Sequence, residues 1–180
     1  MIKLNLGCGW RNFGKEWIHI DGGDYDHLDY NDITKLKFKD DSVDLIYASH
    51  VLEYFDREEA ILVLEEWYRA LKPGGILRIA VPDFETMTNL YYFREINLND
   101  ILGPMFGKMK MGDKNIYHKT VYDFKSLSIL LSKIGFNKSN RYNWKDFKIH
   151  KDNDDSQSYL DPKGDKDNGV LISLNVETTK

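Results

Sequence analysis

A glycine-bearing turn near the N-terminus is the first group of residues whose types and spacing could do chemistry. Residues 3–6 have the pattern of a hydrophobic strand, and Gly7, Cys8 and Gly9 follow directly. Glycine lets a ligand approach the backbone without a Cβ in the way and adopts dihedral angles that other residues avoid. In open α/β sheets, ligands bind beyond the carboxyl ends of the strands, where this turn would lie. The turn is a candidate ligand-binding loop, with a tight structural turn as the alternative.

Two phosphate-binding motifs do not fit this loop. A dinucleotide fingerprint needs a third glycine at position 12, which Asn12 occupies. A P-loop needs Gly-Lys-Ser/Thr after four spacer residues, and the sequence contains no such run. A ligand without a pyrophosphate is therefore favoured.

Two later carboxylates could hold a nucleoside. Asp21 ends a second strand pattern over residues 17–21, and a carboxylate there can accept hydrogen bonds from both hydroxyls of a ribose. Asp32, with the adjacent backbone amide, could hydrogen-bond an adenine edge while Ile33 covers its face. The alternatives are a turn aspartate at position 21, because two glycines follow it, and a solvated loop aspartate at position 32.

Three further side chains could hold or move a proton. Histidine titrates near neutral pH, so His50 and His118 are candidates for a general base. Asp83, just past a buried strand, could orient a hydroxyl or amine of a substrate. Structural roles remain open for each of them: the start of a helix for His50, a surface position for His118 and a helix cap for Asp83.

Alternating strands and helices must position these residues, a pattern that favours a parallel sheet covered on both faces. The clearest helix follows Asp56, which can cap it together with Glu59 three residues later. Proline and glycine at positions 73–75 are expected to end this helix. Strands are expected at residues 3–6, 17–21, 27–30, 43–49, 75–81, 136–144 and 170–176, and further helices at 85–96 and 122–134.

Composition bounds the class of protein. The chain has 180 residues, of which 42% are apolar and 30% charged, as in ordinary soluble globular proteins. A net charge of −4 argues against a nucleic-acid partner. We expect no membrane partner, because no apolar run approaches the roughly 20 residues that cross a bilayer. The immediate strand pattern leaves no room for a signal peptide, so a cytoplasmic location is expected.

Cysteine content and loop composition complete this picture. Cys8 is the single cysteine, which excludes an internal disulfide and a cysteine-based zinc cluster, and no metal is expected. The chain is expected to form one domain over residues 1–180, with a lid or substrate-side insertion at 85–120 and a flexible polar loop at 151–168. Residues 103–117, rich in glycine, methionine and lysine, are expected to be a mobile lid or loop. His150, Asp152, Asp154 and Asp155 could bind a cation or belong to that acidic flexible loop.

In its first half the sequence resembles the class I S-adenosylmethionine-dependent methyltransferases. It is most similar to small predicted methyltransferases associated with surface-polysaccharide or glycan pathways. The matching stretches are LNLGCG (4–9), WIHID (17–21), Asp32-Ile33 ahead of DDSVDLIY (40–47), SHVLEY (49–54) and WYRALKPGGILRIAVPDF (67–84). A weaker match covers residues 118–136.

The resemblance implies a Rossmann-like α/β fold, with a mostly parallel sheet, helices on both faces and an antiparallel C-terminal strand. Only residues 7–16 separate the first two strands, so the first helix must be very short or irregular. The resemblance further implies S-adenosylmethionine as cofactor and S-adenosylhomocysteine as product. The implied sites are the methionine part of the cofactor for Gly7, Cys8 and Gly9, the ribose for Asp21, adenine for Asp32 and Ile33, and methyl transfer for Ser49 and His50.

Methyl transfer to an oxygen or nitrogen of a small molecule or glycan is the leading hypothesis. The sulfonium already makes the methyl group electrophilic, so the protein aligns a nucleophile and removes its proton. A module that binds cofactor but has lost catalysis, and another nucleotide- or sulfonium-using enzyme, remain alternatives. The sequence does not show the oligomeric state.

Overall fold

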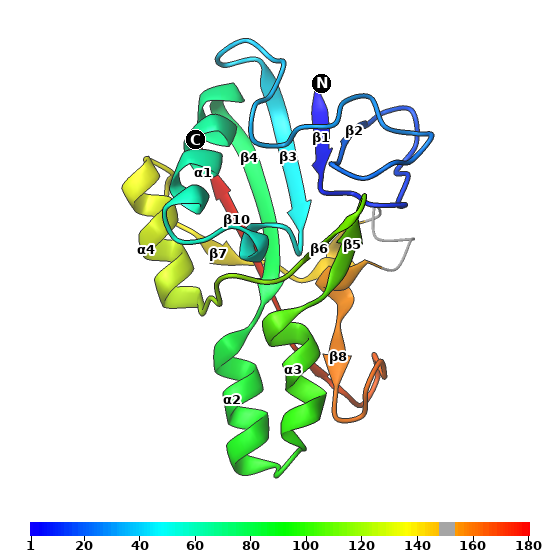
Figure 1. Cartoon of the computed structure of the whole chain (residues 1–180). Coiled ribbons are helices and arrows are strands. Elements are labelled where there is room, and N and C mark those ends of the chain that lie inside the picture. The colour runs from blue at the N-terminus through cyan, green and yellow to red at the C-terminus, as the bar shows by residue number, and fades with distance from the viewer. Residues whose placement is uncertain (148–153) are drawn as a thin grey trace.

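The computed structural model describes residues 1–147 and 154–180, and a six-stranded mixed sheet forms its centre (Figure 1). The strands are β1 (Lys3–Leu6), β2 (Ile18–Ile20), β3 (Val43–Ser49), β4 (Leu71–Pro82), β7 (Asn140–Arg141) and β10 (Ser173–Thr179). Their order is β2-β1-β3-β4-β10-β7. β1 to β4 run parallel, and β10 is antiparallel to both β4 and β7. This arrangement, with its flanking helices, confirms the predicted fold class.

Helices cover the apolar face of the sheet. Side chains alternate between the two faces along a strand, and the strand register aligns Leu4 with Ile46 and Ile46 with Leu77. These side chains are buried in one core with Trp67 and Leu127, which lie on two different helices. The helices of the structure are α1 (Glu59–Ala70), α2 (Phe84–Phe93), α3 (Leu98–Phe106) and α4 (Phe124–Ile134), of which α1 and α4 supply this cover.

The opposite face is polar near its parallel edge. Asn5 is in register with both His19 and Tyr47. Residues 7–17, all within the described part of the chain, form no helix, so the crossover from β1 to β2 is an irregular loop. The ring of Phe13 in this loop packs on His19 and Tyr47, with ring centroids 6.4 and 5.7 Å away. The side chain of Phe13 therefore covers a part of the sheet that the crossover helix, predicted to be very short or irregular, would otherwise cover.

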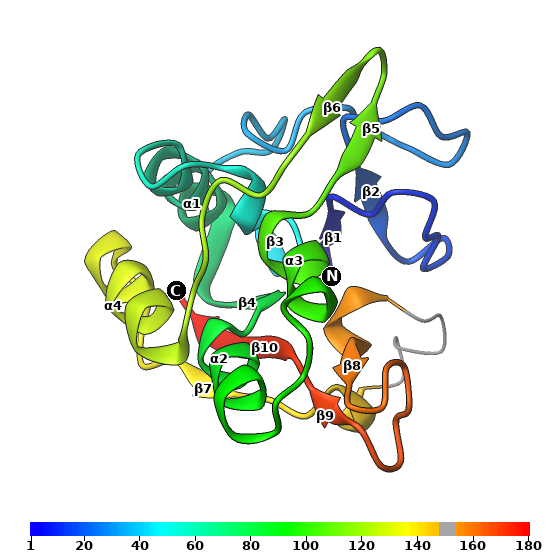
Figure 2. The same cartoon turned by 60° about the horizontal axis from the view of Figure 1, so that its bottom comes forward.

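The segment after β4 is more regular than its sequence predicts. It forms α2, α3 and a hairpin of β5 (Met109–Met111) and β6 (Lys114–Ile116), on the side toward which the arrowheads of β1 and β3 point (Figures 1 and 2). The expectation of a loop over 103–117 is wrong, because these residues complete α3, which buried Ile101 packs against α2, and then form the β5–β6 hairpin; a lid in this region stays a prediction. Gly107 and Gly112 then turn the chain at positive φ.

Other element boundaries differ in detail. The predicted strand at 27–30 is reduced to a single bridge between Ile20 and Tyr30. β4 begins at Leu71, directly after α1 and earlier than the predicted start at residue 75. Residues 73–75 are accommodated by a shift in the register between β3 and β4. Among the described helices, none has the length and apolar character needed to cross a membrane. The remaining elements are β8 (Tyr159–Leu160), β9 (Val170–Leu171) and the 3-10 turns η1 (Leu52–Tyr54), η2 (Trp144–Asp146) and η4 (Asp155–Gln157).

Candidate functional site

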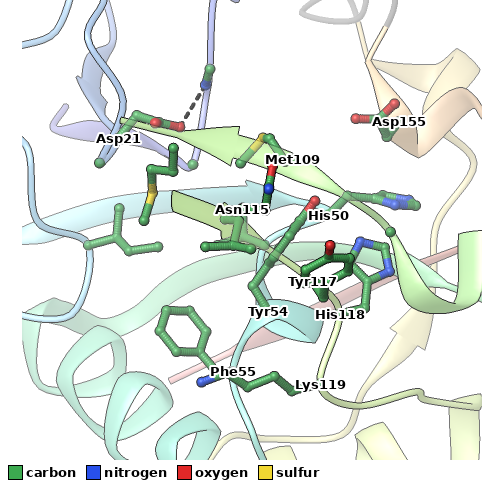
Figure 3. Close-up of a pocket in the computed structure, with 18 of the residues that line it drawn as sticks. Asp21, His50, Tyr54, Phe55, Met109, Asn115, Tyr117, His118, Lys119 and Asp155 are labelled. Carbon is green, nitrogen blue, oxygen red and sulfur yellow. Dashed lines mark hydrogen bonds between the residues drawn. The ribbon is translucent and has the colours of Figure 1, made fainter. Parts of the chain in front are cut away.

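A cavity of about 940 Å³ opens at the carboxyl ends of β1, β2 and β3. The loops after these strands form one wall, and α3 with the β5–β6 hairpin forms the wall opposite. Figure 3 shows Asp21 at one end of the cavity and His50 and His118 at the other, with the hairpin between them. The predicted site residues that line it are Gly7, Gly9, Asp21, Asp32, Ile33, His50 and His118.

The glycine-bearing turn is fixed by its neighbours. Gly7 has φ +64°, and a Cβ added there would lie 2.1 Å from a methyl carbon of Val51. Its amide donates to the carbonyl of Ile20 over 2.8 Å, which ties the turn to the end of β2. Gly9 also has a positive φ, of +55°. Glycine at position 7 is therefore required for close packing as well as for backbone conformation.

Asp21 connects the turn to the tip of β2. One carboxylate oxygen accepts from the Gly9 amide over 2.8 Å (dashed in Figure 3), and the other accepts from the Gly23 amide over 2.7 Å. The residue is 7% exposed, yet it lines the cavity. A carboxylate oxygen has two lone pairs, so each oxygen keeps acceptor capacity toward the cavity.

Asp32 and Ile33 lie farther along the same wall. One oxygen of Asp32 accepts from both the amide and the hydroxyl of Thr34. These hydrogen bonds, led by that of the hydroxyl, lower the pKa of Asp32. Ile33 packs against the core, and its carbonyl accepts from the indole of Trp67. This end of the wall presents an ionised carboxylate beside an aliphatic side chain.

Three predicted site residues do not line the cavity. Burial, with the nearby Asp21 carboxylate, raises the pKa of the Cys8 thiol to about 12. Ser49 accepts from the amide of Ser156. Asp83 caps α2, accepting from the amide and hydroxyl of Thr86, and it also pairs with Arg141. The structural alternative for Asp83, a helix cap, is therefore what the fold shows.

His50 is held by both of its ring nitrogens. It has φ +53°, which is uncommon outside glycine. Nε2 lies 3.0 Å from the hydroxyl oxygen of Ser173, and Nδ1 lies 3.3 Å from Oε1 of Glu53. Burial lowers the pKa of His50 to about 4, so its imidazole is neutral at neutral pH. A strained backbone at a cavity wall is typical of functional positions.

His118 reaches the same point from the opposite wall. Nδ1 lies 2.9 Å from the carbonyl oxygen of Pro104, and Nε2 lies 3.8 Å from Oε1 of Glu53. Its ring meets the ring of Tyr54 edge to face, with centroids 4.6 Å apart. Burial lowers the pKa of His118 as well. The structure thus brings together two histidines that are 68 positions apart in their numbering (50 and 118).

Known proteins share part of this sequence and its fold. Residues 15–79 match the family model described as "Methyltransferase domain", a segment that contains Asp21, Asp32, Ile33 and His50. No curated protein sequence matches the chain. Among solved structures, a SAM-dependent methyltransferase from Thermotoga maritima, described as a possible histamine N-methyltransferase, is 16% identical with a TM-score of 0.60. The match covers 99% of this chain and 82% of that one.

Two further solved structures have the same architecture. A SAM-dependent methyltransferase from Methanosarcina mazei is 18% identical with a TM-score of 0.59, over 99% of this chain and 91% of its own. The 1,6-didemethyltoxoflavin-N1-methyltransferase of Burkholderia thailandensis, solved with S-adenosylhomocysteine, is 13% identical with a TM-score of 0.56, over 99% and 70%. The chain has the methyltransferase fold.

Within this methyltransferase fold, sequence reasoning predicted a lid or substrate-side insertion at 85–120 but did not identify the side chains that line the far wall, apart from His118. Met109, Met111 and Tyr117 line it from the β5–β6 hairpin and the residues after it. The sulfur of Met111 lies 3.1 Å from the position that a Cβ on Gly22 would take, so the hairpin touches the loop after β2. The methionines and glycines of residues 103–117 were the available signal, but they were attributed to a lid or loop without assigned roles.

Glu53 is a further residue of the site whose environment the sequence did not reveal. Its side chain is fully buried beneath the two histidines. In the part of the chain that the structure describes, neither of its carboxylate oxygens has a hydrogen-bond partner. Burial raises the pKa of Glu53 well above its usual range. Of the cation ligands suggested by the sequence, His150 and Asp152 lie outside the described residues.

Proposed function

We propose that this protein is an S-adenosylmethionine-dependent methyltransferase that releases S-adenosylhomocysteine as product. The observation that carries the proposal is Asp21, a carboxylate at the tip of β2 that is tied to the glycine turn and faces a cavity of about 940 Å³. Cofactor pockets in proteins commonly have volumes of about 300–1,000 Å³. When bound, this cofactor supplies an electrophilic methyl group on a sulfonium.

The chain's own residues fit such a cofactor along one wall. Gly7 and Gly9 would border its methionine part, since a Cβ on Gly9 would meet nothing closer than 3.9 Å and the cavity side of the turn is open. Asp21 would accept from the ribose hydroxyls. Asp32 and the side chain of Ile33 would flank the adenine. Cys8 and Ser49 support this wall from behind rather than lining it.

His118 is the residue proposed to hold the acceptor's proton. A carbonyl oxygen can only accept, so Nδ1 of neutral His118 must carry the proton that it donates to Pro104. Nε2 is therefore the unprotonated ring nitrogen, and it can take the proton that an O–H or N–H acceptor gives up. His50 is proposed to orient the site, because its Nε2 is hydrogen-bonded to Ser173 and its Nδ1 lies closer to Oε1 of Glu53, at 3.3 Å, than Nε2 of His118 does, at 3.8 Å. Asp83 caps α2 and pairs with Arg141, and it is given no part in the proposed transfer.

The acceptor is proposed to be an oxygen or nitrogen nucleophile of a small molecule or glycan. It would enter between η1 and the far wall, where Tyr54, Phe55 and Tyr117 offer aromatic faces and Asn115 offers an amide. Figure 3 shows Tyr54 and Tyr117 next to His118.

Calorimetry with S-adenosylmethionine and S-adenosylhomocysteine tests the proposal directly. Binding of both with one-to-one stoichiometry is expected, and failure of both to bind would refute it. A cofactor-binding module without turnover is the second candidate, favoured by the absence of a helix in residues 7–17, all of which are described. Methyl release to a panel of amines and sugars, with His118→Asn as control, separates the enzyme from the module.

A further inference from the structure

Two histidines of the site face one carboxyl group that the proposed methyl transfer does not use. Oε1 of Glu53 lies 3.3 Å from Nδ1 of His50 and 3.8 Å from Nε2 of His118. If either of these nitrogens carried a proton, Glu53 could be an ordinary ionised partner. The protonation of the two rings therefore decides the state of the carboxyl group.

The hydrogen-bond chain behind His50 fixes its protons. The side-chain amide of Asn175 donates to the carbonyl oxygen of Ser156 over 2.9 Å, which leaves Oδ1 of Asn175 as an acceptor. The hydroxyl of Ser173 donates to that Oδ1 over 3.0 Å. A hydroxyl has one proton to donate, so Ser173 must accept from Nε2 of His50. A neutral His50 therefore carries its proton on Nε2 and turns an unprotonated Nδ1 toward Glu53.

A single hydrogen bond fixes the proton of His118. Its proton lies on Nδ1, which donates to the carbonyl of Pro104. Nε2 is unprotonated, and it is the nitrogen that faces Glu53. Two lone pairs, and no donor from either ring, are thus directed at the carboxyl group.

Among the described residues, no positive charge pairs with Glu53, and the nearby guanidinium of Arg11 pairs with Asp155 over 3.2 Å. Tyr54 and Tyr122 are its neutral aromatic neighbours, and burial raises the pKa of both phenols. The carboxylate of Asp155 acts on Glu53 in the same direction as burial, raising its pKa. Lys119, which directly follows His118, directs its ammonium to Glu59 instead.

We propose that Glu53 is a neutral carboxylic acid at neutral pH and that its proton keeps His118 unprotonated and able to act as a base. An ionised carboxylate 3.8 Å from Nε2 would instead favour the imidazolium form of His118, which cannot take a proton from the acceptor. Glu53 is therefore a positioning residue that acts through His118. Burial acts in the same direction, because it raises the pKa of Glu53 and lowers the pKa of both histidines. The role of His118 rests on the proposed methyl transfer, whereas the protonation of Glu53 does not.

Infrared spectroscopy of the protein without added ligand tests the protonation state. Wild type at pH 7 is expected to show the carbonyl stretch of a protonated carboxyl group, and that band should be missing from Glu53→Gln. If the two proteins have the same spectrum in this region, Glu53 is ionised and the proposal is overturned. This readout does not depend on cofactor binding or turnover, so its failure is distinguishable from failure of the proposed function.

The titration of His118, followed by NMR of its ring, gives the second test. Removing a neutral acid should leave the pKa of His118 in Glu53→Gln within about 0.3 units of wild type, whereas removing an opposite charge at this distance lowers it by about one unit or more. The larger shift would contradict the proposal. Glu53→Met, of similar length but without a polar group, shows whether any change comes from packing alone.

Discussion

The backbone amide of Gly9 donates to the carboxylate of Asp21 over 2.8 Å, so the loop after β1 and the tip of β2 form one hydrogen-bonded unit. Replacing Asp21 with alanine removes this acceptor and the proposed ribose ligand together. We expect affinity for S-adenosylhomocysteine to fall at least about tenfold, which corresponds to the loss of a hydrogen bond with a charged group. Calorimetry measures the change. Asp26→Asn, at an exposed aspartate of the following loop, is the matched control and should bind as wild type does.

Gly7→Ala should destabilise the protein strongly. The new methyl group would lie 2.1 Å from Val51 Cγ2, and the backbone at φ +64° is strained for any residue with a Cβ. A loss of about 2–4 kcal/mol in the free energy of unfolding is expected.

Gly14→Ala provides the control, because φ is +88° there and no atom lies within 4 Å of the added carbon. That variant should lose only about 1 kcal/mol. Urea unfolding of both proteins separates steric clash from backbone strain. Equal losses would show that the contact with Val51 is unimportant, and Gly7→Ala/Val51→Ala should recover part of the difference.

His118→Asn should reduce turnover far more than binding. The substitution removes the proposed proton acceptor, and loss of a general base commonly lowers kcat by about 10²- to 10⁴-fold. Because burial lowers the pKa of His118, the neutral base persists below pH 6.5 in wild type and activity should fall only at more acidic pH. Single-turnover methyl transfer over a pH series measures both effects. An unchanged rate in the variant would show that His118 is not the general base.

His50 should make wild type sensitive to acid relative to His50→Asn. Its pKa is about 4 in the folded protein and 6.5 when unperturbed, so the stability that its neutral form provides is complete above pH 6.5. That stability is lost as the pH falls toward 4, by about 1.4 kcal/mol per pH unit, because the unfolded chain takes up a proton. Asparagine does not titrate and tolerates the left-handed conformation. Urea unfolding of both proteins between pH 7 and pH 4.5 should show the difference, and parallel curves would count against a neutral buried His50.

The wall that begins with Gly7 and continues through Asp21 to Ile33 was accessible to sequence reasoning for a physical reason. Parallel strands end at one edge of the sheet, so residues that follow successive strands must meet there. Polar residue types and glycine spacing then indicated which of them could bind a ligand. The short crossover was also visible, because too few residues separate the first two strands to form a regular helix.

The other wall was not accessible in this way. Met111 reaches the loop after β2 only because the chain returns over the sheet after α3, and no local pattern encodes that return. From the sequence alone, Glu53 is indistinguishable from other charged residues of turns. Its significance comes from the position of His118, whose Nε2 lies 3.8 Å from Oε1 of Glu53. Asp83 shows a different limit, since an aspartate after a strand can cap a helix or contact a substrate, and the sequence does not distinguish the two; the structure shows the cap, through Thr86.

Phe13 takes over one of the two structural roles that a crossover helix ordinarily has. Such a helix connects parallel strands, and it also shields one face of the sheet from water. In this chain an irregular loop makes the connection, and the ring of Phe13 covers His19 and Tyr47 together with His27 and Asp154, which belong to later segments. Side chains from separate segments can therefore cover a parallel α/β sheet where the crossover is too short for a helix.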